Sequence, residues 1–182
     1  MTAPMAERIP HDRLSPSDIA GLRRLFDAEY RRDFGEWDPD QPYGYAPHDL
    51  HVISRRGGEI VAHVGWAQRR IGVGDVDLVI GGVGGMLVSS AARGLRLGQR
   101  LLAEVAQSMR DASEASFGYL GCREDVVPFY AASGWQRIAV VESSVSRVGD
   151  AITQAAGPPI LVLPLRENGW PSGAVDLRGR AW

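Results

Sequence analysis

The sequence predicts one α+β domain, because helical and strand patterns alternate along a chain of 182 residues. Apolar residues recur at helical spacing between Ile19 and Tyr30 and again between Leu101 and Met109. Between these helices, short apolar stretches are separated by glycine turns, as in an antiparallel meander. No internal repeat or linker divides the sequence, so we expect residues 1–182 to form a single domain.

The first helix is expected to begin after Ser15, which can cap its amino end, and Pro16 suits the first turn. Gly35 ends the helical pattern. Residues 36–47 are rich in Asp, Pro, Gly and aromatic residues and indicate an ordered loop. The loop is long for its place between a helix and a strand, which suggests a functional role.

The remaining elements follow from the same patterns. Three strands are expected over residues 51–54, 59–70 and 76–88. A helix over 100–112, a strand over 117–122 and a short helix over 124–133 come next. A long strand over 135–148, a loop over 151–159 and a last apolar strand over 160–163 complete the order, and residues 166–182 show no clear periodicity.

Composition excludes several classes of function. The formal net charge is −2 and no basic stripe is visible, so we expect no nucleic-acid partner. The longest apolar run, residues 76–88, is too short to span a membrane, so we expect no membrane partner. The polar N-terminus and the single cysteine, Cys122, favour a cytoplasmic protein without a signal peptide or internal disulfide. His48 and His51 have no carboxylate or cysteine at ligand spacing, so we expect no metal site.

The most informative segment runs from Met86 to Leu102, as a strand, a turn with glycines and the start of a helix. Backbone N–H groups in such a turn, at the positive end of the helix dipole, form a cradle for phosphate. Arg93, Arg96 and Arg100 add positive charge there. The alternative is a plain strand–turn–helix whose glycines serve only packing.

The turn Arg93-Gly94-Leu95-Arg96-Leu97-Gly98 resembles the Arg/Gln-x-x-Gly-x-Gly/Ala motif of the GCN5-related N-acetyltransferase (GNAT) family, with Arg96 in place of a glycine. The resemblance implies the GNAT fold, a mixed central sheet with helices on both faces, and acetyl-CoA as the co-substrate. The pyrophosphate of CoA would rest on residues 93–98. Its pantetheine arm would pair with Met86, Leu87 and Val88 like an added strand.

Two groups within the family are more similar than the rest. Aminoglycoside 2'-N-acetyltransferases share the Arg-Gly-x-Arg-Leu turn, a Tyr-Ala-x-x-Gly-Trp segment at residues 130–135, Asp33-Phe34 and a final tryptophan, here Trp182. A nodulation-type N-acyltransferase, which acylates a chitooligosaccharide amine, is similar at residues 63–65, 73–78 and 170–173. Both acylate an amine on a sugar, so the resemblance implies a small-molecule aminosugar substrate. It also suggests a homodimer.

Carboxylates near the end of the first helix support such a substrate, because charge-assisted hydrogen bonds beside flat apolar walls suit a cationic sugar. The alternative is a solvated acidic face. We assign substrate binding to Glu29, Asp33, Glu36, Trp37, Asp38, Gly84, Gly85, Gly121, Asp176 and Trp182. The aminoglycoside enzymes carry a glutamate at the position of Gly84 and an acid near Ala156. We therefore expect a substrate with fewer amines, of the kasugamycin kind, and resistance to that antibiotic as the outcome.

No Ser-His-Asp or Cys-His set is apparent, so we expect the substrate amine to attack the thioester directly. A backbone N–H near Met86 or Leu87 would hold the oxyanion. Tyr130 matches the family's tyrosine acid, which would protonate the CoA sulfur, although it also suits a core position. The general base stays open among Asp33, Asp176 and a water held by the carboxylate of Trp182.

Three alternatives remain open. A nodulation-type enzyme would use a longer acyl donor on an aminosugar. A protein or small-amine N-acetyltransferase would use the acidic loop to attract lysine. A binding module without enzymatic activity is the third, since a fold does not fix a function.

Overall fold

The computed structural model describes residues 6–182. Residues 1–5, part of the polar N-terminal stretch that argues against a signal peptide, lie outside the described residues. The α-helices are α1 (Pro16–Phe34), α2 (Leu97–Ala112) and α3 (Val127–Ala131). The strands are β1 (Ala6–Pro10), β2 (Leu50–Arg56), β3 (Glu59–Val73), β4 (Val76–Val88), β5 (Phe117–Gly121), β6 (Gln136–Ile138), β7 (Glu142–Val145), β8 (Ala151–Gln154), β9 (Ile160–Pro164) and β10 (Val175–Asp176).

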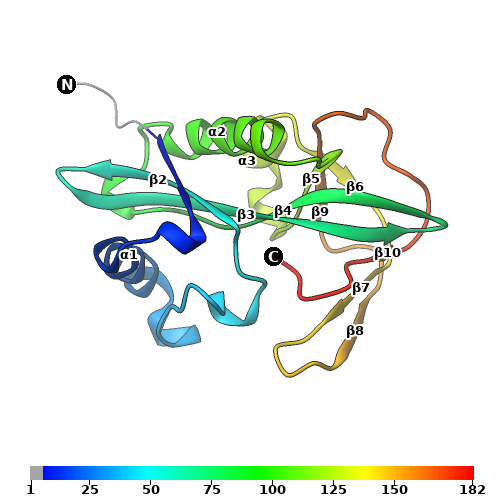
Figure 1. Ribbon diagram of the computed structural model, residues 1–182, viewed down its shortest axis with the longest axis horizontal. Helices are drawn as coiled ribbons and strands as arrows, with labels where there is room; N and C mark the ends of the chain where they lie inside the picture. The colour runs from blue at the N-terminus through cyan, green and yellow to red at the C-terminus, as the bar shows by residue number, and fades with distance from the viewer. Residues whose placement is uncertain (1–5) are drawn as a thin grey trace.

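The strands form one mixed sheet whose spine is the long β3–β4 hairpin (Figure 1). The hydrogen-bonded order is β6-β9-β5-β4-β3-β10-β7-β8, and β2 also pairs with β3 and carries β1 on its other side. The pairs β4–β5 and β10–β7 are parallel, and the other pairs are antiparallel. The predicted meander over β2, β3 and β4 is confirmed.

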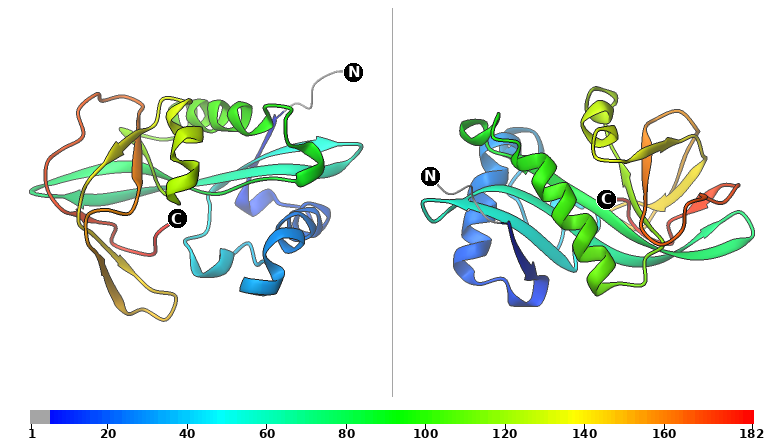
Figure 2. Two further views of the ribbon diagram at one scale, coloured as in Figure 1. Left: turned by 180° about the vertical axis from the view of Figure 1, so that it is seen from behind. Right: turned by 90° about the horizontal axis from the view of Figure 1, so that it is seen from above.

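Helices cover both faces of this sheet, with α2 on one face and α1 on the other (Figures 1 and 2). Side chains alternate between the faces of a strand, so neighbouring residues of β2 enter different cores. Val52 packs with Leu101 and Met109 of α2. Ile53 packs with Leu22 and other residues of α1. The expected α+β class, with helices on both faces, is confirmed.

The first helix begins and ends where its sequence predicts. Ser15 caps it, because its hydroxyl accepts from the backbone N–H of Asp18 at 3.1 Å while Asp18 accepts from the backbone N–H of Ser15 at 2.9 Å. Gly35 ends it with φ +82°, a conformation that favours glycine. Pro16 occupies the first turn, where its missing N–H costs nothing.

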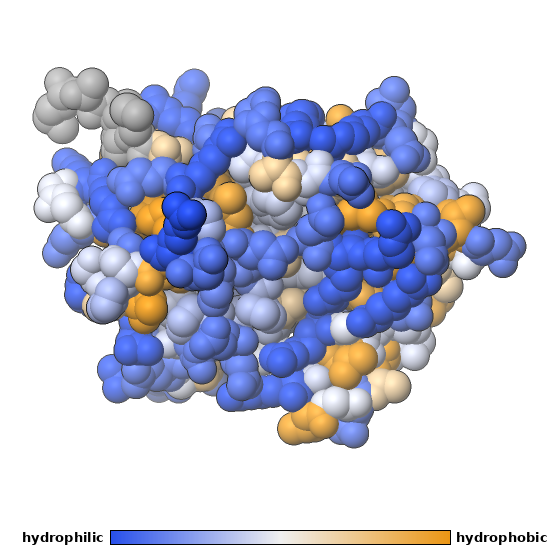
Figure 3. Space-filling model, in the orientation of Figure 1, coloured by the Kyte–Doolittle hydropathy of each residue, from blue (hydrophilic) through white to orange (hydrophobic). Residues whose placement is uncertain are grey.

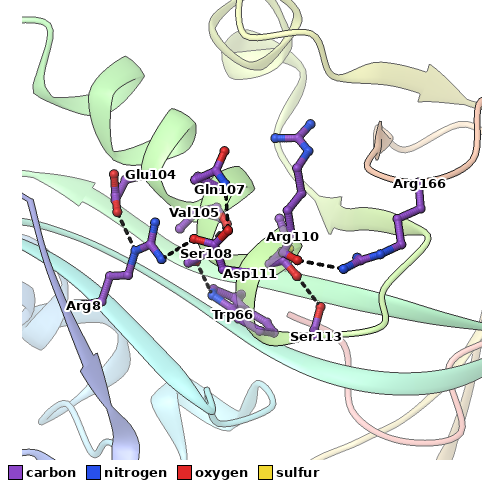
Figure 4. Close-up of polar contacts among 11 residues, drawn as sticks. Arg8, Trp66, Glu104, Val105, Gln107, Ser108, Arg110, Asp111, Ser113 and Arg166 are labelled. Carbon is purple, nitrogen blue, oxygen red and sulfur yellow. Dashed lines mark hydrogen bonds and ion pairs between the residues drawn. The ribbon is translucent and has the colours of Figure 1, made fainter.

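Strand β1 was not expected from the sequence, and polar contacts hold it in place. Arg8 donates to Glu104 at 2.5 Å and to Asp111 at 2.8 Å, so β1 is tied to α2 across the sheet edge (Figure 4). Beneath α2, the indole N–H of Trp66 donates to the buried hydroxyl of Ser108 at 2.8 Å. Five residues with the pattern of β1 carry too little periodicity to indicate a strand.

Three predictions for the second half are wrong in detail. The long strand expected over residues 135–148 is two strands, β6 and β7, interrupted at residues 139–141. The expected loop 151–159 contains β8, which closes a hairpin with β7. The residues beyond 165 include the short strand β10, whose pairing between β3 and β7 comes from tertiary contacts. The other predicted elements are confirmed within a few residues.

The surface in Figure 3 is mainly hydrophilic, with separate apolar patches. Among the large hydrophobic residues of the described chain, Val148, in the turn between β7 and β8, has the largest exposed fraction, 82 %. Among residues 6–182, no helix has both the length and the apolar character needed to cross a bilayer.

Candidate active site

A gap opens in the sheet where β4 and β5 separate. These parallel strands pair over residues 80–82 and 117–119, and no further pair between them is found in the described chain. Strand β4 continues six residues beyond this point, to Val88, while its other edge stays paired with β3. Alternate residues of β4 therefore direct N–H and C=O groups toward an open edge. A strand-like molecule can bind such an edge by β-augmentation.

A β-bulge shapes the same stretch of β4. Gly65 pairs with Gly84 and His63 pairs with Leu87, so two residues of β4, Gly85 and Met86, face one residue of β3. Gly85 has φ +61°, which a side chain rarely tolerates, and its carbonyl accepts from the Nδ1 atom of His63 at 2.7 Å. The bulge turns the backbone around Met86 and Leu87, where the oxyanion donor is expected.

The predicted phosphate turn lies directly before α2. Arg96 is the N-cap residue of α2, and no side chain caps this end. The first N–H groups of the helix have no intrahelical acceptor, so they are free for an anion. Gly94 has φ +80° and open space around it, and Leu95 is exposed. The backbone geometry therefore fits the phosphate cradle that the motif indicates.

Three residues of the turn have contacts or burial that the motif does not show. Arg93 donates to the carbonyl of Val88 at 3.3 Å and to the carboxylate of Glu29 at 3.3 Å, so its charge is partly neutralised. Gly98 is a packing position, because a Cβ there would lie 2.9 Å from Phe129 and 3.1 Å from Met86. Leu97 is buried, so it can contribute only its backbone to a cofactor.

Tyr130 lies on α3, next to Phe129, which packs against the turn. The side chain is buried in the core beneath α2. Burial raises the pKa of Tyr130, so its phenol stays protonated at neutral pH, as a proton donor must. Burial also raises the pKa of the Cys122 thiol, which argues against a thiolate nucleophile.

The comparison with protein families identifies the chain. The sequence pattern of the family described as nodulation protein A (NodA) matches residues 11–180. The chain belongs to the NodA family.

Solved structures show the fold of this NodA-family chain. The Escherichia coli protein ElaA is 21% identical, with a TM-score of 0.63, over 88% of this chain and 99% of that one. A GNAT family N-acetyltransferase from Escherichia coli (YhbS) in complex with CoA is 17% identical, with a TM-score of 0.61, over 97% of this chain and 92% of that one. A GNAT family acetyltransferase from Brucella melitensis in complex with acetyl-CoA is 16% identical, with a TM-score of 0.54, over 94% of each chain. The GNAT fold is confirmed by these matches. The resemblance to aminoglycoside enzymes stays a prediction.

The expected carboxylates of this NodA-family protein are spread over one end of α1 and do not form a single cluster. Glu29 contacts Arg93, and Glu36 forms an ion pair with Arg23 at 2.9 Å. Asp38 accepts from the backbone N–H of Asp40 at 2.9 Å. Asp33 is exposed near the end of α1. Several of these carboxylates therefore already have partners, which weakens the expectation of a site for a polycation.

Two assignments to the substrate site are wrong. Trp37 is 1% exposed and stacks on Phe26 with the ring centroids 5.0 Å apart, so it belongs to the core under α1. Asp176 pairs with Gly72 at the hairpin end of β3, whereas Gly84 pairs with Gly65. Seven residues of strand separate these positions, or about 23 Å. Asp176 is therefore too far from the bulge to act as the base.

Trp182 and the β4 glycines do come together, as the sequence analysis expects. A Cβ on Gly84 would lie 3.4 Å from Trp182 and 3.2 Å from Nε2 of His48. Arg69 lies over the Trp182 ring, with its guanidinium carbon 3.9 Å from the centroid. Gly121 ends β5, and a Cβ there would meet only the carbonyl oxygen of Pro159, at 4.0 Å. The place where the aminoglycoside enzymes carry a glutamate is therefore occupied by an imidazole and an indole.

Three histidines lie at this site, although no metal site was expected from the sequence and no role was assigned to them. His48 comes from the loop before β2, His51 from β2 and His63 from β3, and all three are buried. Their separation in the sequence hides the cluster, because the pairing of β2 with β3 brings them together. Strands β2 and β3 were both predicted, as an antiparallel pair. Because side chains alternate between the two faces of such a pair, this pairing could have indicated that His51 and His63 lie on the same face of the sheet.

Proposed function

We propose that this protein is an N-acyltransferase that transfers an acyl group from a CoA thioester to an amine of an aminosugar. The observation that carries the proposal is the open edge of β4 beside the uncapped amino end of α2. The edge suits the two amides of a pantetheine arm, and the helix end suits the pyrophosphate. Met86, Leu87 and Val88 would bind the arm, and the backbone of residues 93–98 would bind the phosphates.

The reaction would proceed by direct attack. The neutral amine nitrogen bonds to the thioester carbonyl carbon, and a backbone N–H at Met86 or Leu87 stabilises the oxyanion. The carbon–sulfur bond then breaks, the positively charged nitrogen passes its proton to water, and Tyr130 protonates the departing thiolate and regains a proton from solvent. An amide and free CoA are the products. Burial raises the pKa of the Tyr130 phenol, which keeps the donor protonated at neutral pH but also makes it a weaker acid.

The match to the NodA family over residues 11–180 favours a sugar amine as the acceptor. It also favours the nodulation-type alternative, in which a longer acyl chain is transferred to a chitooligosaccharide amine. The acidic residues near α1 are mostly paired, so a monoamine sugar suits the site better than a polyamine. Antibiotic acetylation of a kasugamycin-like compound and a homodimer both stay predictions.

A thiol-release assay tests this function. Acetyl-CoA and a long-chain acyl-CoA are each offered with partly deacetylated chitooligosaccharides, glucosamine, kasugamycin, several 2'-amino aminoglycosides and a lysine peptide. Thiol release with a sugar amine, and an N-acyl product in NMR, would support the proposal. Turnover with the lysine peptide alone would show that the acceptor is a lysine amine and not a sugar amine. No turnover by a protein that still binds acetyl-CoA in calorimetry would contradict the aminosugar proposal.

A further inference from the structure

Three of the chain's four histidines form a hydrogen-bonded line from the β4 bulge to the surface. His63 contacts the Gly85 carbonyl through Nδ1 at 2.7 Å, and its Nε2 lies 2.9 Å from Nδ1 of His51. Nε2 of His51 lies 3.0 Å from Nδ1 of His11, and Nε2 of His11 lies 3.0 Å from the Asp40 carboxylate. Both nitrogens of each ring are therefore in use.

This line needs one more positive charge than three neutral rings supply. A carbonyl and an ionised carboxylate only accept hydrogen bonds, and these two groups close the ends of the line. The four contacts need four donors, whereas three neutral imidazoles carry three N–H groups. If His63 donates to the Gly85 carbonyl and His11 donates to the Asp40 carboxylate, His51 can donate to only one of its two neighbours. At its other contact, two nitrogens without hydrogen then face each other. One cation, either an extra proton or a metal ion, therefore has to lie in the line.

The fourth histidine, His48, lies against the line and takes no part in it. Its ring centroid is 5.6 Å from that of His51 and 5.8 Å from that of His63. Its Nδ1 atom is buried and finds no hydrogen-bond partner among the described residues. An unpartnered buried nitrogen is costly. An extra proton in the line would leave this nitrogen unsatisfied, whereas a metal ion at the centre of the three rings would give the His48 ring a partner.

We propose that His48, His51 and His63 bind a divalent transition-metal ion of the zinc type behind the β4 bulge. Candidate ligand atoms of the three residues lie within 4.8 Å of one another. Nδ1 of His51 and Nε2 of His63 lie 2.9 Å apart. Zinc–nitrogen bonds of about 2.0–2.1 Å in a tetrahedron place ligand nitrogens roughly 3.3 Å apart. The His51–His63 separation is slightly shorter than this value, and the other separations do not exceed 4.8 Å.

The hydrogen bonds around the three rings are those of a metal site. A ligating histidine usually donates its other N–H to a carbonyl, a carboxylate or a similar acceptor. With a metal between His51 and His63, His63 donates to Gly85, His51 donates to His11, and His11 donates to Asp40. Every acceptor then has one donor, and all three rings of the line are neutral. The metal supplies the charge that the hydrogen-bond count requires.

Burial prepares the three ligands. It lowers the pKa of His48 to about 3, that of His51 to about 2 and that of His63 to about 4, and neighbouring rings lower the first two further. The imidazoles therefore remain unprotonated at neutral pH, the form in which nitrogen binds a metal. Phe26 covers the cluster from α1, edge-on to His63 at 5.2 Å.

A route from solvent leads to the site. A surface cavity of about 430 Å³ is lined by His11, Asp12, Asp40, Pro47, His48 and Asp49. Its carboxylates attract cations, and His48 forms the boundary between the cavity and the cluster. Three protein ligands leave a fourth position for water or an exogenous group, as in catalytic zinc sites. Because His63 donates to Gly85, the ion would also fix the bulge beside the acyl-binding edge.

The experiment uses the full chain without a histidine tag. Metal content is measured by mass spectrometry after purification, and the ion is then removed with a chelator. The stripped protein is titrated with Co²⁺, whose visible absorption reports tetrahedral nitrogen coordination. We expect saturation at one Co²⁺ per chain, competition by Zn²⁺, and a higher melting temperature with either ion. Folded, stripped protein that binds neither ion at micromolar concentration would overturn the proposal and leave an extra proton as the cation.

Variants separate the metal from the extra proton. His48→Gln removes the one ligand outside the hydrogen-bonded line, so it should abolish Co²⁺ binding while leaving a proton-only line intact. His11→Gln removes an outer partner and should weaken binding by about 10- to 100-fold. Cys122→Ser, which removes the only thiol, should bind as the wild type does. Wild-type Co²⁺ binding by folded His48→Gln would refute the assignment, and if that variant does not fold, the wild-type titration decides.

Discussion

The indole ring of Trp182 lies directly against Gly82 of β4. A Cβ at residue 82 would come within 2.3 Å of three atoms of the ring, Cδ2, Cε2 and Cε3. Gly82→Ala must therefore displace Trp182 from the β4 glycines. We expect a loss of about 1–3 kcal/mol in the free energy of unfolding, which is typical of overpacking. Urea denaturation followed by tryptophan fluorescence measures it.

Gly121→Ala is the matched control for this change. Gly121 is also a strand glycine of the candidate site, but a Cβ there would meet only the carbonyl of Pro159, at 4.0 Å. We expect its stability to stay within about 0.5 kcal/mol of the wild type. Equal effects of the two substitutions would show that Trp182 does not hold the position described.

Arg96 occupies a conformation that favours glycine, the residue usual at this position in the GNAT motif. Its φ is +57°, in the left-handed region, which costs an ordinary residue roughly 1–2 kcal/mol. Arg96→Gly removes this strain but makes the unfolded chain more flexible, which offsets about 0.4–1 kcal/mol. We therefore expect stability to be unchanged or slightly raised, as measured by thermal unfolding.

The same variant tests whether the positive charge of Arg96 contributes to the binding of CoA. If its guanidinium contacts the phosphates of CoA, Arg96→Gly should weaken acetyl-CoA binding by roughly 2- to 5-fold, the value of an exposed ion pair. The difference should shrink as salt is added. Arg70→Ala removes an exposed charge at the far end of β3 and should leave the affinity unchanged. Equal affinities for wild type and Arg96→Gly would contradict the phosphate contact.

The sequence predicts local features of this fold better than long-range ones. Ser15, Pro16 and Gly35 mark the ends of α1 because caps act within one turn, and the glycines of the β3–β4 hairpin mark its turn in the same way. Residues 135–148 read as one strand, since nothing in their pattern shows where the pairing partner changes from β9 to β10 and β8. Pairing partners are tertiary information.

The same difference between local and long-range features decides which parts of the candidate site could be predicted. The turn before α2 is contiguous in the sequence, so its geometry could be predicted from its glycines. Trp37 was misassigned, because an aromatic residue in an acidic loop gives no sign that it turns back to stack on Phe26. The histidine cluster was missed because its members are brought together by the pairing of β2 with β3 and by the loop that carries His48. Nothing short of the β2–β3 register places His63 beside His51.

The pH dependence of stability should reveal the cap of α1. Burial alone would raise the pKa of Asp18, but hydrogen bonds from Ser15 and Arg55 outweigh it and hold the pKa below its usual value of 3.8. A lowered pKa contributes stability above the unfolded-state value, and this contribution is lost as the pH falls through the folded-state value. Asp18→Asn should therefore cost about 1–2 kcal/mol at pH 7 and less below pH 3.8.

Denaturant unfolding at pH 7 and at pH 3 tests whether the cost of Asp18→Asn decreases as the pH falls. Asp33→Asn serves as the control on the same helix, because Asp33 is exposed near its end. Its effect should stay within about 0.5 kcal/mol at both values of pH. A cost of Asp18→Asn that grows toward low pH would mean that the ionised carboxylate is not the stabilising form.

Tyr130→Phe tests the proposed proton donor. The substitution keeps the ring that packs against Phe129 and Trp135, so the fold and the binding of acetyl-CoA should be preserved. Loss of a general acid typically lowers turnover by about 10²- to 10⁴-fold. We expect kcat to fall while the Kd for acetyl-CoA, measured by calorimetry, changes less than 3-fold, or about 0.7 kcal/mol. Tyr45→Phe, which removes an exposed phenol, should leave both unchanged. A fully active Tyr130→Phe enzyme would remove Tyr130 from the mechanism, and water would then have to protonate the thiolate.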